Sequence, residues 1–296
     1  MRGISILDMA ACLVDLTQTA ARKIRQVARR TLRATDHCGA DRGTQLALAM
    51  AWPQHLNRDF RDVEFRNFSQ NGEDGILLYL FSLIGHGNRR AVELCAGDGI
   101  ECNSANLIVH HDWDALLLDG NPELIAKGRE FYSQHQETSR LGPTLAAEWI
   151  TVENVNQILT KHGYDDAIDF LSLDMDGVDY WILEAIQLRP RLIVVEYNNR
   201  IPADKSVTVP YKSDFATDDP FAGDGFFGAS LAAFDKLLDG YRLVGANRHN
   251  TNAFFLRDDV LPDRSAVPVA SCLTSRWAQH QQRQWPALSG HAWVEV

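Results

Sequence analysis

The sequence predicts an α/β protein built on an open, mostly parallel sheet with helices on both faces. Short apolar segments rich in β-branched residues, typical of buried parallel strands, alternate with segments whose apolar residues recur at helical spacing. Several apolar segments end in glycines or carboxylates, where ligands bind in open sheets of this kind. The chain has 296 residues, of which 45% are hydrophobic. This length suits one large α/β domain with additions.

The charge and the cysteines exclude several classes of protein. The formal net charge is −10 at pH 7, whereas nucleic-acid-binding proteins favour basic faces, so we expect no nucleic acid as partner. The five cysteines form no C-x-x-C pair, which argues against a structural zinc site and a disulfide framework and favours a cytoplasmic location. No apolar run approaches the roughly 20 residues of a membrane span.

The first 60 residues are predicted to form a helical extension and a linker. Residues 4–34 carry apolar residues on one helical face, and the second half of this segment is basic. The basic residues at spacings of three and four are Arg22, Arg25, Arg29 and Arg33. We expect this helix to dock on the domain or on a second subunit, which would make a homo-oligomer. A membrane surface or an anionic partner is the alternative.

A capped helix is predicted next. Ser69 or Asn71 precedes Glu73 and Asp74, and acids in a first turn suit the helix dipole. Because this helix comes just before a glycine turn, Gln70 and Glu73 are candidates for closing a ligand pocket there. A plain capped helix is the alternative.

The central stretch of the chain is residues 90–108. It begins as a short apolar segment that predicts a buried strand. Gly97 and Gly99 then allow a tight turn, because a residue without Cβ takes positive φ at no steric cost. A helix follows, with Asn103 or Ser104 as its N-cap. Backbone N–H groups and a helix N-terminus would face an open crevice, which suits a nucleotide-type ligand.

Two carboxylates narrow down that ligand. A dinucleotide fingerprint needs a third glycine, and here Cys102 stands in that position. Glu93, inside the strand, suits a ligand with a cationic amino group. Asp119 ends a second apolar strand, 20 positions after Gly99, the spacing at which a strand-end carboxylate binds a ribose diol. Asn121 then precedes a helix that begins with proline.

A third strand is predicted over residues 149–152, followed by Glu153 and a helix. In this architecture the end of the third strand borders the adenine, so Glu153 is a candidate contact there. An acidic first helical turn is the alternative.

Polar oxygen ligands follow the next two predicted strands. The residues at these two strand ends are Asp174, Asp176, Glu196 and Asn198. Clustered carboxylates repel one another, so the site suits a cation, either a substrate amine or a hard metal ion such as Mg²⁺. In the alternative without metal, Asp174 and Asp176 cap the following helix and hydrogen bond to substrate or cofactor.

The last part of the chain adds an insertion and a hairpin. Residues 200–228 form a long polar connection, a length typical of lids and substrate loops. A helix over residues 230–238 precedes two strands, 241–245 and 252–256. Their turn would bring His249 near the site, and a surface histidine is the alternative. The remaining residues are predicted to be an irregular packed tail.

Several of these motifs, in this order, resemble the FkbM-type methyltransferases over roughly residues 66–259. The stretches that carry the resemblance are Ser69-Gln70-x-Gly-Glu-Asp-Gly, Val-Glu-Leu-x-Ala-Gly-Asp-Gly-Ile-Glu-Cys-Asn, Asp119-Gly-Asn-Pro-Glu, Leu-Ser-Leu-Asp-x-Asp-Gly-x-Asp-Tyr, Val-Val-Glu-Tyr-Asn and Asn-Ala-Phe-Phe-Leu-Arg-Asp-Asp. One departure is visible: Cys95 stands where motif I of class I methyltransferases has its first glycine.

The resemblance implies a class I methyltransferase (Rossmann-like) fold with a mostly parallel seven-stranded sheet over residues 61–260. The extension 1–60 would precede it, and a tail, 261–296, would pack on it. It also implies S-adenosylmethionine as cofactor, and O-methylation of a hydroxyl on a sugar or another small molecule such as a secondary metabolite. Two other classes stay open: a nucleotide-dependent oxidoreductase, and a domain that binds without catalysing.

Site residues follow from the motifs and the resemblance together. Glu93 would face the methionine amine, the backbone of residues 95–99 would hold the methionine moiety, and Asp119 would bind the ribose. The full set of expected cofactor contacts is Gln70, Glu73, Glu93, Cys95, Gly97, Asp98, Gly99, Asn103, Asp119, Asn121 and Glu153. An acceptor hydroxyl needs help in losing its proton, and the candidates for this are Asp174, Asp176, His249 or a bound Mg²⁺.

Overall fold

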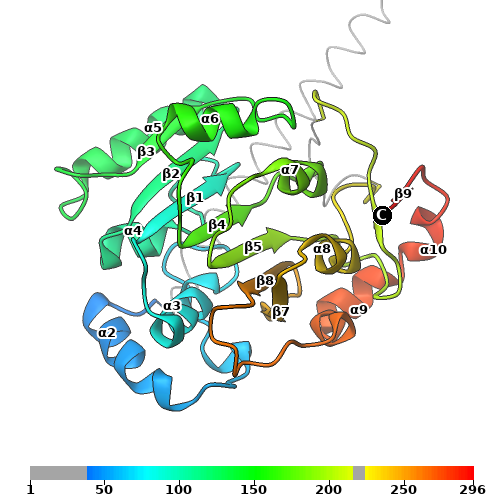
Figure 1. Ribbon diagram of the computed structural model, residues 1–296, viewed down its shortest axis with the longest axis horizontal. Helices are drawn as coiled ribbons and strands as arrows, with labels where there is room; N and C mark the ends of the chain where they lie inside the picture. Colours follow the sequence, from blue (N-terminus) through cyan, green and yellow to red (C-terminus); the bar gives the residue numbers. More distant parts are fainter. Residues whose placement is uncertain (1–38, 216–223) are drawn as a thin grey trace, which may run out of the picture. The chain divides into compact units, whose positions relative to one another are not determined.

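The computed structural model describes residues 39–215 and 224–296, and residues 40–296 form one compact unit (Figure 1). The helix predicted over residues 4–34 lies outside the described residues, as does the part of the insertion from 216 to 223.

A seven-stranded sheet forms the centre of this unit, in the order β3-β2-β1-β4-β5-β8-β7 (Figure 1). The strands are β1 (Arg90–Leu94), β2 (Asp114–Asp119), β3 (Thr144–Ala147), β4 (Phe170–Leu173), β5 (Leu192–Glu196), β7 (Tyr241–Ala246) and β8 (Asn252–Arg257). β1 to β5 pair in parallel, and β8 runs antiparallel to both β5 and β7. The predicted Rossmann-like fold, a mostly parallel seven-stranded sheet with helices on both faces, is confirmed.

Helices cover both faces of the sheet because strand side chains alternate between two apolar cores. One core contains Ala91 and Leu117, and the other contains Val92 and Leu116. The helices of the first core are α3 (Glu73–Ile84), α4 (Ala105–His111) and α5 (Pro122–Gln134). Those of the second core are α6 (Val155–Lys161), α7 (Asp179–Ala185) and α8 (Leu231–Leu237).

The strand order reverses between β1 and β4, where Leu94 lies opposite Leu173. Connections after these two strands therefore leave in opposite directions and open a crevice at their carboxyl ends. The predicted glycine turn follows β1, and the predicted carboxylates follow β4 and β5. The topology thus places the glycine turn and the carboxylates together at the carboxyl ends of the parallel strands.

The third strand was predicted in the wrong place, over residues 149–152, and forms earlier as β3. Leu145 and Ala146 pair with Leu117 and Leu118 of β2. Trp149 instead leaves the sheet, is 53% exposed, and packs its ring over the backbone of the residue after Asp119. Trp149 makes a loop contact and Ile150 packs in the core beside the sheet, and the apolar pattern does not distinguish such residues from a strand.

Additional segments surround the sheet at both ends of the described chain. The first are α2 (Arg42–Ala51), which packs against α3, and two short turns of 3₁₀-helix, η1 (Trp52–Gln54) and η2 (Phe60–Asp62). The C-terminal segment forms η3 (Val269–Leu273), α9 (Arg276–Gln282), α10 (Trp285–Leu288) and β9 (Val294–Glu295). β9 pairs with β6 (Val207–Thr208) of the insertion, so the predicted irregular tail contains regular structure. In the described ranges, no helix combines the length and the apolar character needed to cross a membrane.

Candidate active site

The turn after β1 adopts left-handed backbone conformations at three alternate positions. The φ angles are 59° at Cys95, 61° at Gly97 and 66° at Gly99. A Cβ at Gly97 would meet no atom within 4 Å, so its backbone borders open space. A Cβ at Gly99 would lie 2.8 Å from the Leu117 Cδ1 atom, so this glycine is needed for packing on β2. Gly97 therefore offers the approach to a ligand, and Gly99 holds the turn in place.

Cys95 has a left-handed backbone conformation, which glycine adopts more readily than any other residue. A side chain in the left-handed region costs about 1–2 kcal/mol, so the position still calls for glycine. Burial, and then the nearby negative charge of Asp119, raise the pKa of the Cys95 thiol well above its usual range. The thiol is therefore neutral and is not a reactive nucleophile.

Glu93 is 4% exposed and binds the protein's own backbone. Its two oxygens accept hydrogen bonds from the N–H groups of Asn103 (2.8 Å) and Ser104 (2.7 Å). Asn103 in turn donates its side-chain amide to the Ser172 hydroxyl in β4 (3.0 Å). These contacts fix the start of α4 against β1 and β4. They turn the Glu93 carboxylate toward the backbone rather than toward open space.

Asp119 joins the ends of the first two strands. One carboxylate oxygen accepts from the Gly97 N–H (2.9 Å) and the other from the Asn121 N–H (2.7 Å). Burial raises the pKa of this half-buried carboxylate. Each oxygen keeps acceptor capacity beyond its single backbone bond. Asn121 caps α5 through the Glu123 N–H (2.9 Å), and Asp98 accepts from the N–H of residue 100 (3.1 Å).

Glu73 lies deep in the protein, where it anchors the β7–β8 turn. Oε1 accepts from the side-chain amides of Asn247 (2.6 Å) and Asn252 (2.9 Å), and Oε2 from the Asn71 N–H (2.8 Å). Its neighbour Gln70 is exposed. The contacts of Glu73 thus connect α3 to the hairpin.

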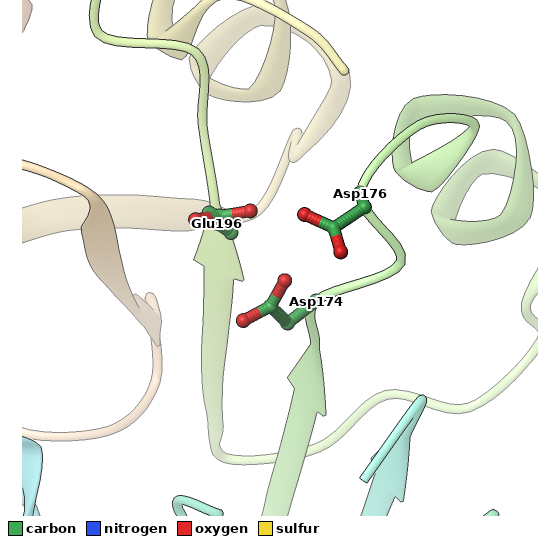
Figure 2. Close-up of side chains that lie close together, drawn as sticks. All are labelled: Asp174, Asp176 and Glu196. Carbon is green, nitrogen blue, oxygen red and sulfur yellow. The ribbon is translucent and has the colours of Figure 1, made fainter. Parts of the chain in front are cut away.

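The predicted carboxylates after β4 and β5 converge (Figure 2). One oxygen from each of Asp174, Asp176 and Glu196 lies within 4.8 Å of the other two. Burial, followed by the charge of Asp176, raises the pKa of Asp174 to about 8. Burial and the charge of Asp174 raise the pKa of Glu196 well above its usual range. Three carboxylates this close hold a proton or a cation among them.

The loop that carries this cluster is shaped by a fourth acid, Asp179. Its carboxylate accepts from the N–H groups of Met175 (2.7 Å) and Gly177 (3.0 Å). Asp176, between them, has a left-handed φ of 55°. Strained backbone of this kind concentrates at functional sites, where the surroundings enforce it.

Two predicted partners of the cluster have other contacts. Asn198 accepts from the Arg200 N–H (3.1 Å) and donates to the carbonyl oxygens of Gly225 and Phe227 (2.9 Å each). It holds the insertion and does not join the carboxylates. His249 lines a separate hollow with residues of α9.

A segment of the insertion covers the ends of β2 and β3. The Tyr211 hydroxyl donates to Glu153 (2.8 Å), and the Trp149 ring N–H donates to the Ser213 carbonyl (2.7 Å). The Phe215 ring packs directly on Gly177, beside the carboxylate loop. Trp149 was not predicted to anchor this segment. Its exposed position after β3 becomes evident only once that strand is placed correctly.

Comparisons with known proteins give only distant similarities. No family model matches the chain, and no curated protein matches it. A solved S-adenosylmethionine-dependent methyltransferase from Clostridium acetobutylicum is 11% identical with a TM-score of 0.40, covering 71% of this chain and 98% of its own. The N-terminal domain of EvdMO1 with SAH bound is 13% identical with a TM-score of 0.43, covering 75% and 98%.

A third solved structure lies at the same distance. It is a putative protein-L-isoaspartate O-methyltransferase from Plasmodium falciparum, in complex with S-adenosyl-L-homocysteine. It is 11% identical with a TM-score of 0.31, covering 56% of this chain and 81% of its own. At such identities and TM-scores the activity has to be argued from the chain's own residues, and the FkbM-type resemblance stays a prediction.

Proposed function

We propose that this chain is an S-adenosylmethionine-dependent methyltransferase that O-methylates a hydroxyl group on a sugar or a secondary metabolite. The observation that carries the proposal is the Gly97–Asp119 contact at the reversal of strand order. It places an open backbone turn and a carboxylate with spare acceptor capacity side by side at a crevice. This pairing suits a nucleoside with a ribose diol and a charged tail.

The residues present fit that cofactor. Asp119 would accept hydrogen bonds from the ribose hydroxyls, and the open backbone at Gly97 would contact the methionine moiety. Glu93 would act indirectly, by fixing the helix start that borders the crevice. Trp149 and the Tyr211 segment would close the adenine side. When bound, the cofactor supplies an activated methyl group on a sulfonium, so the protein's work is alignment and proton removal.

The carboxylate cluster would serve the acceptor. Two roles fit it: Asp174 takes the hydroxyl proton as a general base, or the three acids hold Mg²⁺. The donor set is made of oxygens, as Mg²⁺ prefers, although Asn198 is not among them. Activity that persists in excess chelator would assign the proton-accepting role. Activity lost in chelator and restored by Mg²⁺ would assign the metal.

Cofactor binding is tested by Asp119→Ala. Calorimetry should show affinity for S-adenosylmethionine lowered about tenfold or more, because the ribose loses a charged acceptor. Asp114→Ala is the matched control, since Asp114 begins the same strand and pairs with Arg90 at the surface (3.4 Å), away from the crevice. Equal affinity in the Asp119 variant and the wild type would refute the ribose assignment.

Methyl transfer is tested by mass spectrometry on a panel of hydroxylated sugars and metabolites incubated with protein and cofactor. The expected result is a mass gain of one methyl group on at least one compound. Cofactor binding without any transfer across a broad panel would instead favour a domain that binds without catalysing.

A further inference from the structure

A second hollow opens at the far edge of the sheet, away from the carboxylate cluster. Its volume is about 700 Å³, and it is bounded by η2, the end of β7 and residues 264–275. β7 is three strand spacings from β4 in the sheet order. At about 4.8 Å per spacing, this is about 14 Å.

One of its arginines, Arg264, is buried without a counter-charge. It is 5% exposed, and its guanidinium donates to the carbonyl oxygens of Leu56 (2.7 Å) and Val244 (3.2 Å) and to the Tyr79 hydroxyl (3.2 Å). Among the described residues no carboxylate pairs with it, and its Nε has no hydrogen-bond partner. Burial lowers the pKa of Arg264, yet a guanidinium keeps its charge in proteins.

A second arginine of the hollow, Arg58, likewise has no carboxylate partner among the described residues. Within the part of the chain that the structure describes, its guanidinium makes no hydrogen bond or ion pair, and its Nε is buried. The Arg58 backbone N–H donates to the Tyr79 hydroxyl (3.1 Å), the group that also contacts Arg264. One tyrosine therefore holds both arginine segments at the same wall.

The other two arginines of the hollow have acidic partners. Arg61 pairs with Asp59 (2.6 Å) and Arg248 with Glu64 (2.9 Å). These pairs show that carboxylates are available nearby, and that Arg58 and Arg264 nevertheless remain without one.

The Arg264 guanidinium also lies over the rings of Phe60 (5.1 Å) and Tyr79 (5.6 Å), but these contacts and its hydrogen bonds to neutral groups do not neutralise its charge. A buried Arg264 and a half-buried Arg58 without carboxylate partners at one cavity wall therefore indicate a site for an anion.

We propose that this hollow binds an oxyanion, either phosphate or sulfate, free or carried on a small molecule. Guanidinium groups present paired donors that match the oxygens of such anions. The hollow that His249 lines, of about 710 Å³, adjoins this one. It shares Arg248 and adds the basic residues Arg276 and Arg283. An anion longer than a single phosphate therefore meets further positive charge. The site does not depend on the proposed methyl transfer.

Calorimetric titration of the full chain with potassium phosphate tests the proposal, with potassium chloride at equal ionic strength as reference. We expect saturable binding of phosphate and none of chloride. Arg58→Gln should weaken phosphate binding about tenfold, because the anion loses a charged donor. The fold should stay intact, because the Arg58 guanidinium makes no hydrogen bond to the described residues. Arg189→Gln is the control: it removes the same charge from beside Tyr241, at the opposite end of β7.

A second arm uses a sugar phosphate in place of inorganic phosphate. Tighter binding of the sugar phosphate supports an oxyanion carried on an organic ligand, and equal binding supports an anion contacted only through its phosphate. Absence of saturable phosphate binding to the wild type overturns the proposal. Equal weakening by Arg58→Gln and Arg189→Gln also overturns it, since that result reflects only net charge.

Discussion

The carboxylate cluster and the arginine hollow gather opposite charges at one sheet, and they differ in how the crowding is relieved. A carboxylic acid takes up a proton, and burial, followed by the charge of Asp176, raises the pKa of Asp174 to about 8. A guanidinium keeps its proton and its charge even when it is buried in a protein. Arg58 and Arg264 therefore stay charged without a carboxylate among the described residues. Crowded carboxylates can take up a proton or bind a cation, whereas crowded guanidinium groups call for an external anion.

The largest expected effect comes from Asp174→Asn. Methyl transfer should fall about a thousandfold, because the variant loses its proton acceptor or metal ligand while the cofactor crevice stays intact. Kinetics with saturating cofactor would measure it. The melting temperature should not fall, because the substitution relieves repulsion among half-buried carboxylates.

The matched control for that experiment is Asp239→Asn, an exposed acid after α8. Its turnover and melting temperature should equal those of the wild type. Unchanged turnover in Asp174→Asn would show that the Asp174 carboxylate takes no part in methyl transfer.

A buried carboxylate with neutral partners provides the next test. Glu73 accepts from the amides of Asn247 and Asn252 and from one backbone N–H, so its charge needs no cation. Glu73→Ala should lower the free energy of unfolding by about 3 kcal/mol, because buried donors lose their acceptor. Denaturant unfolding would measure it. Gln70→Ala, at an exposed neighbour, should change it by less than about 0.5 kcal/mol.

The two charged regions also differ in how far the sequence predicts them. Asp174 and Glu196 follow neighbouring buried strands, so their convergence follows from strand order alone. Arg58 and Arg264 lie more than 200 positions apart in segments without periodicity, and arginine is usually a surface residue. Their meeting depends on how peripheral segments fold over β7. No local pattern contains that information.

Within the sheet the same distinction applies. β1, β2, β4 and β5 were predicted because each is a short apolar run that ends in a recognisable motif. β3 was misplaced because Trp149 gives the following segment apolar character for another reason, the anchoring of a loop. Asn198 stands at the right strand end, yet its amide binds the insertion. Position in the sequence did not reveal that competing use.

His111 is a base that, unlike Arg58 and Arg264, can become neutral when it is buried, so it tests the comparison between the charged regions. The His111 ring donates from Nε2 to the Gln45 side-chain oxygen (2.7 Å), and burial lowers its pKa to about 4. The folded pKa lies below the unfolded value of about 6.5, so the folded state binds fewer protons. Stability should therefore decline as pH falls from about 6.5 to about 4. Allowing for partial exposure, His111 accounts for about 2 kcal/mol of this loss.

His111→Gln isolates this contribution, because glutamine keeps a donor toward Gln45 and does not titrate. Denaturant unfolding at pH 7 and pH 4.5 would compare the variant with the wild type. The difference between the two proteins should grow at the lower pH in favour of the variant. A difference that is independent of pH would mean that His111 has the same pKa in the folded and the unfolded state, so burial does not disfavour its charged form.

The smallest expected effect concerns Cys95, which lies beside the negative region without carrying charge. Its φ of 59° is one that glycine adopts freely, so Cys95→Gly should raise stability by about 1 kcal/mol. Cys272→Ala, a buried cysteine in η3, removes a thiol without relieving positive φ and should destabilise instead. Thermal unfolding of both variants measures the contrast. If Cys95→Gly also destabilises the protein, the packing of the neutral thiol beside the nearby carboxylates contributes more to stability than the backbone strain costs.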